Sequence, residues 1–139
     1  MMIKTAGLMK TDIRNRKDIM LLVNSFYDKV RMDVTIGRFF NEVVKINWEE
    51  HLPKMYSFWE SVLFGTGGYK GNAIRKHLEV NRQSPLELKH FEQWLVLFKA
   101  TVDEHFEGEK AAEVKQRAIA MSQLMLFKIG QSAEPTFIA

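Results

Sequence analysis

Apolar residues recur every three or four positions in four long segments of this chain, and this repeat limits its possible folds more than any other feature. The first segment begins at Arg16, has Asn15 as its expected N-cap, and ends before a break at residues 33–37. Its apolar side chains share one helical face: Ile19, Leu22, Val23, Phe26, Tyr27 and Val30. This pattern predicts an amphipathic helix packed on a core.

The second segment covers residues 47–63, with Asn47 as its expected N-cap. Pro53 lies inside this segment, and because proline lacks a backbone N–H, we expect the helix to start nearer Glu49. His51 begins an apolar stripe that continues through Met55, Phe58 and Val62. This placement suggests that His51 faces something buried rather than solvent.

Two more helices are predicted in the second half of the chain, one starting at Pro85 and one covering residues 109–129. Gly130 is expected to cap the last helix. The apolar faces are Leu88, Phe91, Trp94, Leu95, Phe98 and Val102 in the first, and Ala111, Val114, Ala118, Met121, Met125 and Ile129 in the second. Since no useful stretch alternates with the period of a strand, we predict an all-α fold.

The length of 139 residues indicates one domain. Lys4, Lys10 and Asp12 interrupt any signal-peptide core, and no apolar run approaches the roughly 18 residues needed to cross a bilayer. We therefore expect a cytoplasmic protein with no membrane partner. The predicted parts are an N-terminal arm at residues 1–14, the domain at residues 15–130 and a loose tail at residues 131–139.

Composition excludes several classes of function. The net charge of +3 is spread along the chain without a basic block or a nucleic-acid-binding motif, so no nucleic-acid partner is expected. The absence of cysteine excludes disulfides and thiolate sites, and the four histidines form no HxxxH or HExxH pair that would indicate zinc. Ten Phe and eight Met suit either an apolar core or a slot for an apolar ligand.

Three features carry candidate chemistry, each with a structural alternative. His77 follows a glycine-rich loop, with apolar neighbours at helical spacing, and on this stretch alone a core histidine is an equally good interpretation. Tyr27 lies on a buried face, where its hydroxyl needs a partner that could be a backbone carbonyl. Phe39 and Phe40 could fill the core at a corner, or one could stack on a flat ligand. Haem suits this set because its porphyrin leaves the protein only one imidazole to supply.

The chain resembles the group III truncated haemoglobins over roughly residues 15–130. The segments that carry the resemblance occur in the order and approximate spacing of that family: FYDKVR at 26–31, IGRFF at 36–40, WEEH at 48–51, FW at 58–59, YKG at 69–71, HL at 77–78 and FEQWLVLF at 91–98. The resemblance implies a two-over-two helical sandwich around haem b that reversibly binds O2, NO or CO.

The resemblance also implies a role for individual residues. His77 matches the proximal ligand of the haem iron, and Tyr27, His51 and Trp94 match the distal residues, with His51 as a gate or a weak donor. The residues expected to contact the haem are Phe39, Phe40, Met55, Phe58, Trp59, Phe91 and Phe98. Arg75 and Lys76 could reach a haem propionate, or lie on a solvated face. His90 and His105 match no functional position and are expected at the surface or at helix ends.

Two other functions fit the same residues. The site could catalyse NO dioxygenation or peroxide chemistry, and because the chain has no flavin or nicotinamide domain, sustained turnover would need a separate reductase. A haem-free helical interaction module, in which the aromatic residues are only core, belongs to a different class. Uptake of haem separates it from the first two, and turnover with NO or peroxide separates the enzyme from the ligand carrier.

Overall fold

The computed structural model describes residues 9–43, 47–67, 81 and 86–133. The described elements are α2 (Arg16–Met32), the π-helix η1 (Phe39–Val43), α3 (Trp48–Phe64), α5 (Leu88–His105) and α6 (Glu109–Ala133). These residues contain no strand, and the prediction of an all-α fold is confirmed. None of the described helices is long and apolar enough to cross a membrane.

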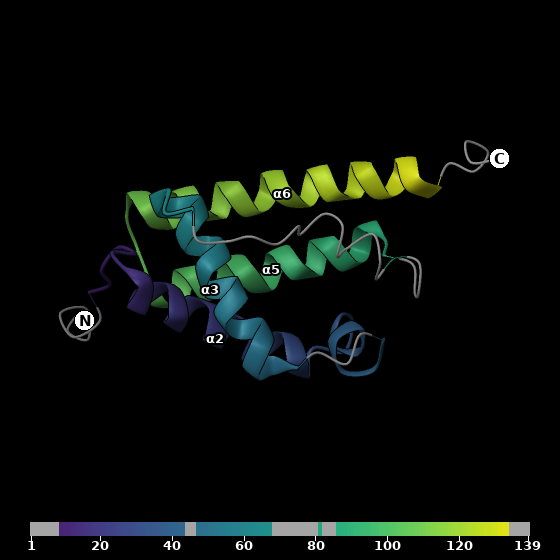
Figure 1. The fold of residues 1–139 in the computed structure, drawn as a ribbon, viewed down its shortest axis with the longest axis horizontal. Coiled ribbons are helices and arrows are strands. Elements are labelled where there is room, and N and C mark those ends of the chain that lie inside the picture. The colour runs from purple at the N-terminus through teal and green to yellow at the C-terminus, as the bar shows by residue number, and fades with distance from the viewer. Residues whose placement is uncertain (1–8, 44–46, 68–80, 82–85, 134–139) are drawn as a thin grey trace.

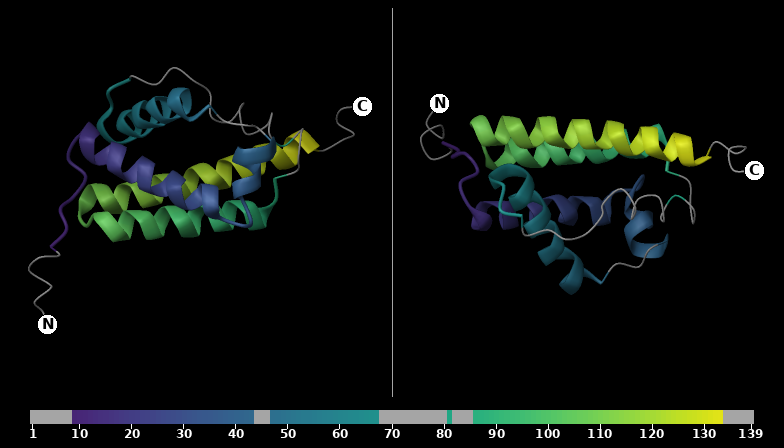
Figure 2. Two further views of the ribbon diagram at one scale, coloured as in Figure 1. Left: turned by 90° about the horizontal axis from the view of Figure 1, so that it is seen from below. Right: turned by 45° about the horizontal axis from the view of Figure 1, so that its top comes forward.

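The helices are arranged as one pair on another. The helices α5 and α6 run side by side in opposite directions, joined by the short connection at residues 106–108 (Figure 1). The helix α2 packs against α3 and α5, while α3 also reaches α6, so that α2 and α3 form the second layer (Figure 2). This is the predicted two-over-two sandwich, with one main core between the layers.

The helix α2 confirms its predicted pattern. The Asn15 side chain accepts a hydrogen bond of 3.1 Å from the Asp18 N–H, which caps the first turn. At the other end, the Asp33 carboxylate accepts from the N–H groups of Thr35 and Ile36, both at 3.0 Å, and fixes the turn that follows. All six residues of the predicted apolar face are buried.

The helix α3 starts at Trp48, one residue earlier than the Pro53 argument suggested. Asn47 caps it as predicted, accepting from the Glu49 N–H at 3.1 Å. Pro53 is exposed within the helix, and its missing N–H leaves one carbonyl in the preceding turn without its helical donor. The proline therefore weakens the early part of α3 without displacing its start.

The helix α5 starts at Leu88, which is later than predicted; Pro85 lies outside the described residues. The cause is local, because the Glu87 N–H donates to Nδ1 of His90 at 2.9 Å and so fixes the first turn. Leu88 was predicted on the apolar face but is 57% exposed, since the first turn of α5 extends beyond the core. Phe91, Phe98 and Val102 are buried as predicted.

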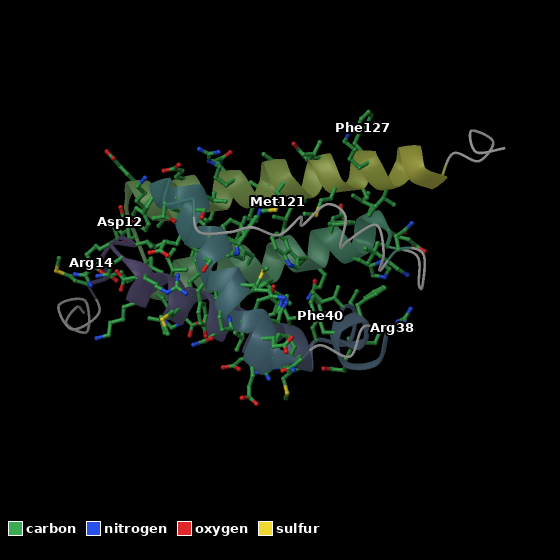
Figure 3. The ribbon with its side chains drawn as sticks, in the orientation of Figure 1. Asp12, Arg14, Arg38, Phe40, Met121 and Phe127 are labelled. Atoms are coloured by element: carbon green, nitrogen blue, oxygen red, sulfur yellow. The ribbon has the colours of Figure 1, made fainter. Side chains whose placement is uncertain are left out.

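The helix α6 continues through Gly130 to Ala133, so the predicted C-terminal cap at Gly130 is wrong. A glycine stays in a helix when its φ remains negative, and Gly130 is not among the glycines with positive φ. Met125 and Ile129 are buried as predicted, whereas Phe127 points away from the molecule and Met121 points toward α5 (Figure 3).

Residues 9–14 of the predicted arm pack on the domain. Ile13 is buried, and Thr11 forms an isolated parallel bridge with Phe106. The Asp12 carboxylate accepts from the N–H groups of Lys110 and Ala111, both at 2.8 Å. These bonds cap the first turn of α6 from a distant part of the chain, which no local sequence pattern indicates.

Candidate functional site

Four aromatic side chains meet where α2, η1 and the first turn of α3 come together. The ring centroid of Tyr27 lies 5.8 Å from Phe40, 5.3 Å from Trp48 and 5.3 Å from His51. Trp48 also contacts His51, at 5.6 Å, and stacks on Phe40 at 6.1 Å. We call these four residues the Tyr27 cluster. It unites two of the predicted distal residues, Tyr27 and His51, with one of the predicted haem contacts.

Local structure explains how the Tyr27 cluster forms. The Asn47 cap starts α3 at Trp48, and because residues three apart share a helix face, Trp48 and His51 both face α2. The π-helical turn directs the two adjacent phenylalanines to different neighbours. Phe39 contacts His90 of α5 at 4.7 Å, whereas Phe40 reaches Tyr27. The two phenylalanines thus have different neighbours, and whether one of them stacks on a flat ligand stays a prediction.

Trp94 belongs to a second group of rings beside the Tyr27 cluster. It lies 5.5 Å from Phe26 and stacks nearly parallel on Phe98, at 5.3 Å and 6°. Phe26 in turn lies 5.0 Å from Tyr27, so it connects the two groups. Phe98 continues the contacts to Trp59, at 5.0 Å. The third predicted distal residue is therefore separated from Tyr27 by one ring, that of Phe26.

The remaining predicted haem contacts are spread over the core. Met55 and Phe58 are partly buried and pack on the main core, and Trp59 and Phe98 are almost fully buried within it. Phe91 is buried in a separate apolar cluster with Met125 and Ile129. Contact between a haem and each of these five predicted side chains stays a prediction.

The predicted proximal side lies outside the described residues. This applies to His77, the expected iron ligand, and to Arg75 and Lys76, the expected propionate contacts. Among the residues that the structure does describe, no three His, Asp or Glu side chains come close enough to hold a metal ion.

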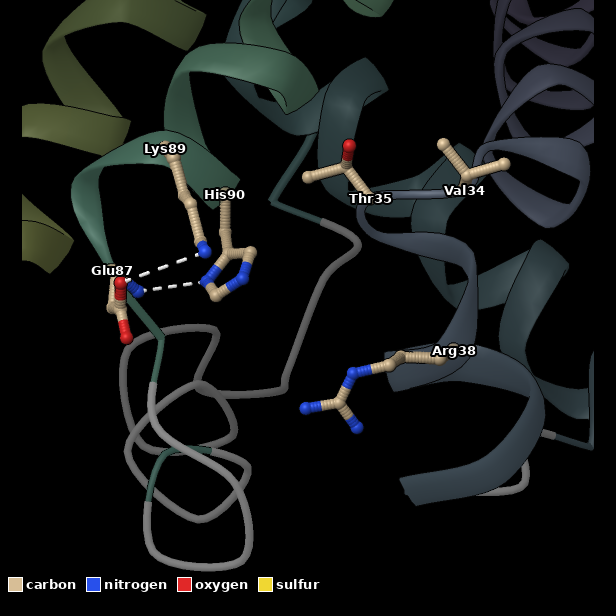
Figure 4. Close-up of a pocket in the computed structure, with 6 residues that line it drawn as sticks. All are labelled: Val34, Thr35, Arg38, Glu87, Lys89 and His90. Carbon is tan, nitrogen blue, oxygen red and sulfur yellow. Dashed lines mark hydrogen bonds and ion pairs between the residues drawn. The ribbon is translucent and has the colours of Figure 1, made fainter.

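A hollow of about 440 Å³ lies beside His90, whose ring contacts Phe39, and no member of the Tyr27 cluster lines it. Figure 4 shows Thr35 and Arg38 facing His90 and Lys89 across it. Burial lowers the pKa of His90, Glu87 opposes this effect, and the charges of Lys89 and Arg38 lower the pKa further. The neutral imidazole of His90 can then accept the hydrogen bond from the Glu87 N–H at the start of α5. His90 and His105 lie in the first and last turns of α5, as expected for helix-end residues.

Sequence reasoning gave no role to two residues at the Tyr27 cluster. Trp48 contacts all three other members, and the Arg31 guanidinium lies 4.7 Å from the centre of the Trp48 ring. One signal was available, because Arg31 is four positions after Tyr27 and so lies on the same side of α2. Its partner on α3 could not be read from that spacing.

The cluster combines apolar surface with hydrogen-bond donors. Tyr27 carries a phenolic O–H, and both imidazole and indole carry an N–H. Tyr27 is 6% exposed, and Nε2 of His51 is buried. Donors in such an enclosed place interact strongly with a small polar or partly charged ligand, because little water competes for them.

Known proteins resemble this chain in both sequence and structure. The chain is 34% identical over 128 residues to the group 3 truncated hemoglobin ctb of Campylobacter jejuni. This match covers 88% of this chain and 98% of that protein. It also matches the crystal structure of the group III truncated hemoglobin from Campylobacter jejuni with a TM-score of 0.76 and 31% identity, over 87% of this chain and 95% of that one. No protein-family model matches the chain.

Proposed function

Since this chain belongs to the group III truncated haemoglobins, we propose that it binds haem b and reversibly holds O2, NO or CO beside Tyr27, His51 and Trp94. One observation carries the proposal: α2 and α3 bring the ring centroids of Tyr27 and His51 to 5.3 Å from each other. The identity with the truncated haemoglobin extends along most of the chain, which makes a haem-free interaction module the weaker interpretation.

The described residues fit one face of a haem. A porphyrin needs flat apolar surroundings, and Phe40 and Trp48 offer stacked rings beside Tyr27. A porphyrin also supplies four of the iron ligands itself, so the fold needs only one imidazole and no cluster of metal-binding side chains. When bound, haem supplies the iron atom to which diatomic gases coordinate.

Tyr27 and Trp94 act as hydrogen-bond donors to the gas ligand in this proposal. Donation to a partly charged acceptor contributes roughly 1.5–3 kcal/mol, or about 10- to 150-fold in affinity. Most of this effect falls on the dissociation rate, because the bond exists only after the ligand has arrived. His51 acts in this proposal as a gate to the same space or as a weaker donor.

His77 is the residue that we propose would ligate the haem iron, and the family relationship and its place shortly after the glycine-rich segment of the sequence support this role. We further propose that Arg75 and Lys76, next to it in sequence, reach the propionates. Met55, Phe58, Trp59, Phe91 and Phe98 complete the proposed apolar lining, with Phe39 behind Phe40.

The first test is the absorption spectrum of the purified chain, oxidised, reduced with dithionite, and reduced under CO. We expect a Soret band that shifts at each step and is lost or strongly changed in His77→Ala. The matched control is His105→Ala, which removes a half-buried imidazole at the far end of α5. A chain that takes up no haemin, or a spectrum that His77→Ala leaves unchanged, would contradict the proposal.

A further inference from the structure

Trp48, like Tyr27, contacts all three other members of the Tyr27 cluster. Its ring contacts Tyr27, Phe40 and His51, and the side chain is only partly buried. Each such aromatic contact contributes roughly 0.5–1.5 kcal/mol beyond the apolar area that it buries. The position of the His51 ring therefore depends on the indole as well as on Tyr27.

Arg31 covers the Trp48 ring from the last turn of α2. Its guanidinium lies 4.7 Å from the ring centroid, and the same side chain donates to the Asp28 carboxylate at 2.8 Å. The carbonyl of Arg31 accepts from the Asn41 side chain at 3.1 Å, which ties the turn to η1. Arg31 therefore joins the three elements that form the Tyr27 cluster.

We propose that Trp48 and Arg31 form a latch that holds His51 against Tyr27 and thereby restricts access of the gas ligand. This proposal rests on the proposed function, because the access it describes is access to the haem iron. In it, Trp48 and Arg31 are positioning residues that act through His51. Neither is required to touch the ligand.

The strength of the latch sets how often it opens. The contribution of Arg31 is weak. Its side chain is 38% exposed and that of its partner Asp28 is 69% exposed, so water screens both the cation–π contact and the ion pair. The aromatic contacts of Trp48 hold more firmly. We therefore expect His51 to be released about threefold more often in Arg31→Met and about tenfold more often in Trp48→Ala.

The test measures release of His51 and access of the ligand separately. Release is followed by the rate at which diethyl pyrocarbonate modifies the His51 imidazole in the haem-loaded chain, read by peptide mass, with His105 as the internal reference. Access is followed by the association rate of CO after flash photolysis. Both rates should rise about threefold in Arg31→Met and about tenfold in Trp48→Ala, while Trp48→Phe should keep most of the restraint.

Arg16→Met is the matched control. Arg16 lies over the Tyr56 ring at 5.8 Å and pairs with Glu60 at 2.7 Å, so it repeats the chemistry of Arg31 at the other end of α2. Its loss should lower stability and leave both rates unchanged.

The outcomes separate the latch from the proposed function. If the wild-type chain takes up haem but neither rate changes in Arg31→Met and Trp48→Ala, the latch is overturned and the proposed function stands. Faster modification of His51 with unchanged CO association also overturns it. A wild-type chain without haem would overturn the proposed function, and with it the control of access.

Discussion

Tyr27 is the residue on which gas binding is most directly testable. Replacing it with phenylalanine removes one O–H and keeps the ring that contacts His51 and Trp48. We expect O2 to dissociate about 10- to 150-fold faster from Tyr27→Phe, because a hydrogen bond to a partly charged acceptor is lost. Stopped-flow displacement of O2 by CO measures this rate.

Tyr56→Phe provides the control for that experiment. The Tyr56 hydroxyl donates to the Asn24 side chain on α2, so the change removes a partly buried hydrogen bond outside the Tyr27 cluster. It should lower the free energy of unfolding by about 1 kcal/mol and leave O2 dissociation unchanged. Equal dissociation rates in Tyr27→Phe and the wild type would show that the hydroxyl does not reach the ligand.

The second prediction concerns Asp12 and the pH dependence of the free energy of unfolding. Burial raises its pKa, but the N–H groups of Lys110, Ile13 and Ala111 and the charge of Lys110 outweigh this, so the net pKa is lowered from 3.8. A lowered pKa means that the ionised form stabilises the fold above the ordinary pKa, and that this contribution is lost as the pH falls through the lowered value. Asp12→Ala should cost about 1–2 kcal/mol at pH 7 and clearly less at pH 3, by urea unfolding.

Asp103→Ala is the control for Asp12. It removes a carboxylate that is 61% exposed and paired only with Lys115 in the described contacts. An exposed ion pair contributes at most about 1 kcal/mol, so the loss at pH 7 should be smaller than that of Asp12→Ala. If the difference between Asp12→Ala and the wild type were the same at both pH values, the ionised cap would not be the source of the stability.

At the scale of the helix, two glycines at α6 should respond to alanine in opposite ways. Gly130 lies inside the helix with nothing within 4 Å of an added Cβ, so Gly130→Ala should raise the free energy of unfolding by about 0.5–1 kcal/mol. Gly108, just before α6, has a φ of 143°, and an added Cβ would lie 2.5 Å from Cγ of Asp12. Gly108→Ala should therefore be destabilising.

Thermal unfolding of both variants measures the difference. A destabilised Gly130→Ala chain would mean that Gly130 ends the helix in solution, which was the interpretation drawn from sequence. The sign of one measurement thus decides where α6 ends.

The helices themselves were predictable because their signal is local. The faces of α2 and α5 follow from apolar spacing, and the caps at Asn15 and Asn47 follow from side chains beside the helix start. The helix ends that were wrongly predicted depend on contacts outside the helix itself. Leu88 is exposed because the core does not extend to the first turn of α5, and no period within α5 carries that information.

The site was predictable in its residues but not in its contacts. Tyr27, His51 and Trp94 were selected by resemblance and by their apolar faces, and the structure brings the first two together. The roles of Trp48 and Arg31 could not be predicted, since they arise from a contact between α2 and α3. Likewise, Asp12 reaches α6 across most of the chain.

At the scale of the whole molecule, haem binding and stability are coupled, because a ligand that binds only the folded chain stabilises it by RT ln(1 + [L]/Kd). Far above Kd, each tenfold increase in free haem should then add about 1.4 kcal/mol to the free energy of unfolding. Urea unfolding at increasing haemin concentrations measures this slope. We expect it in the wild type and in His105→Ala, and we expect His77→Ala to need much more haemin to reach it, since the iron ligand is removed. If His77→Ala followed the wild-type curve, haemin would be binding elsewhere on the chain, and neither the axial role of His77 nor the arrangement of donors around Tyr27 would hold.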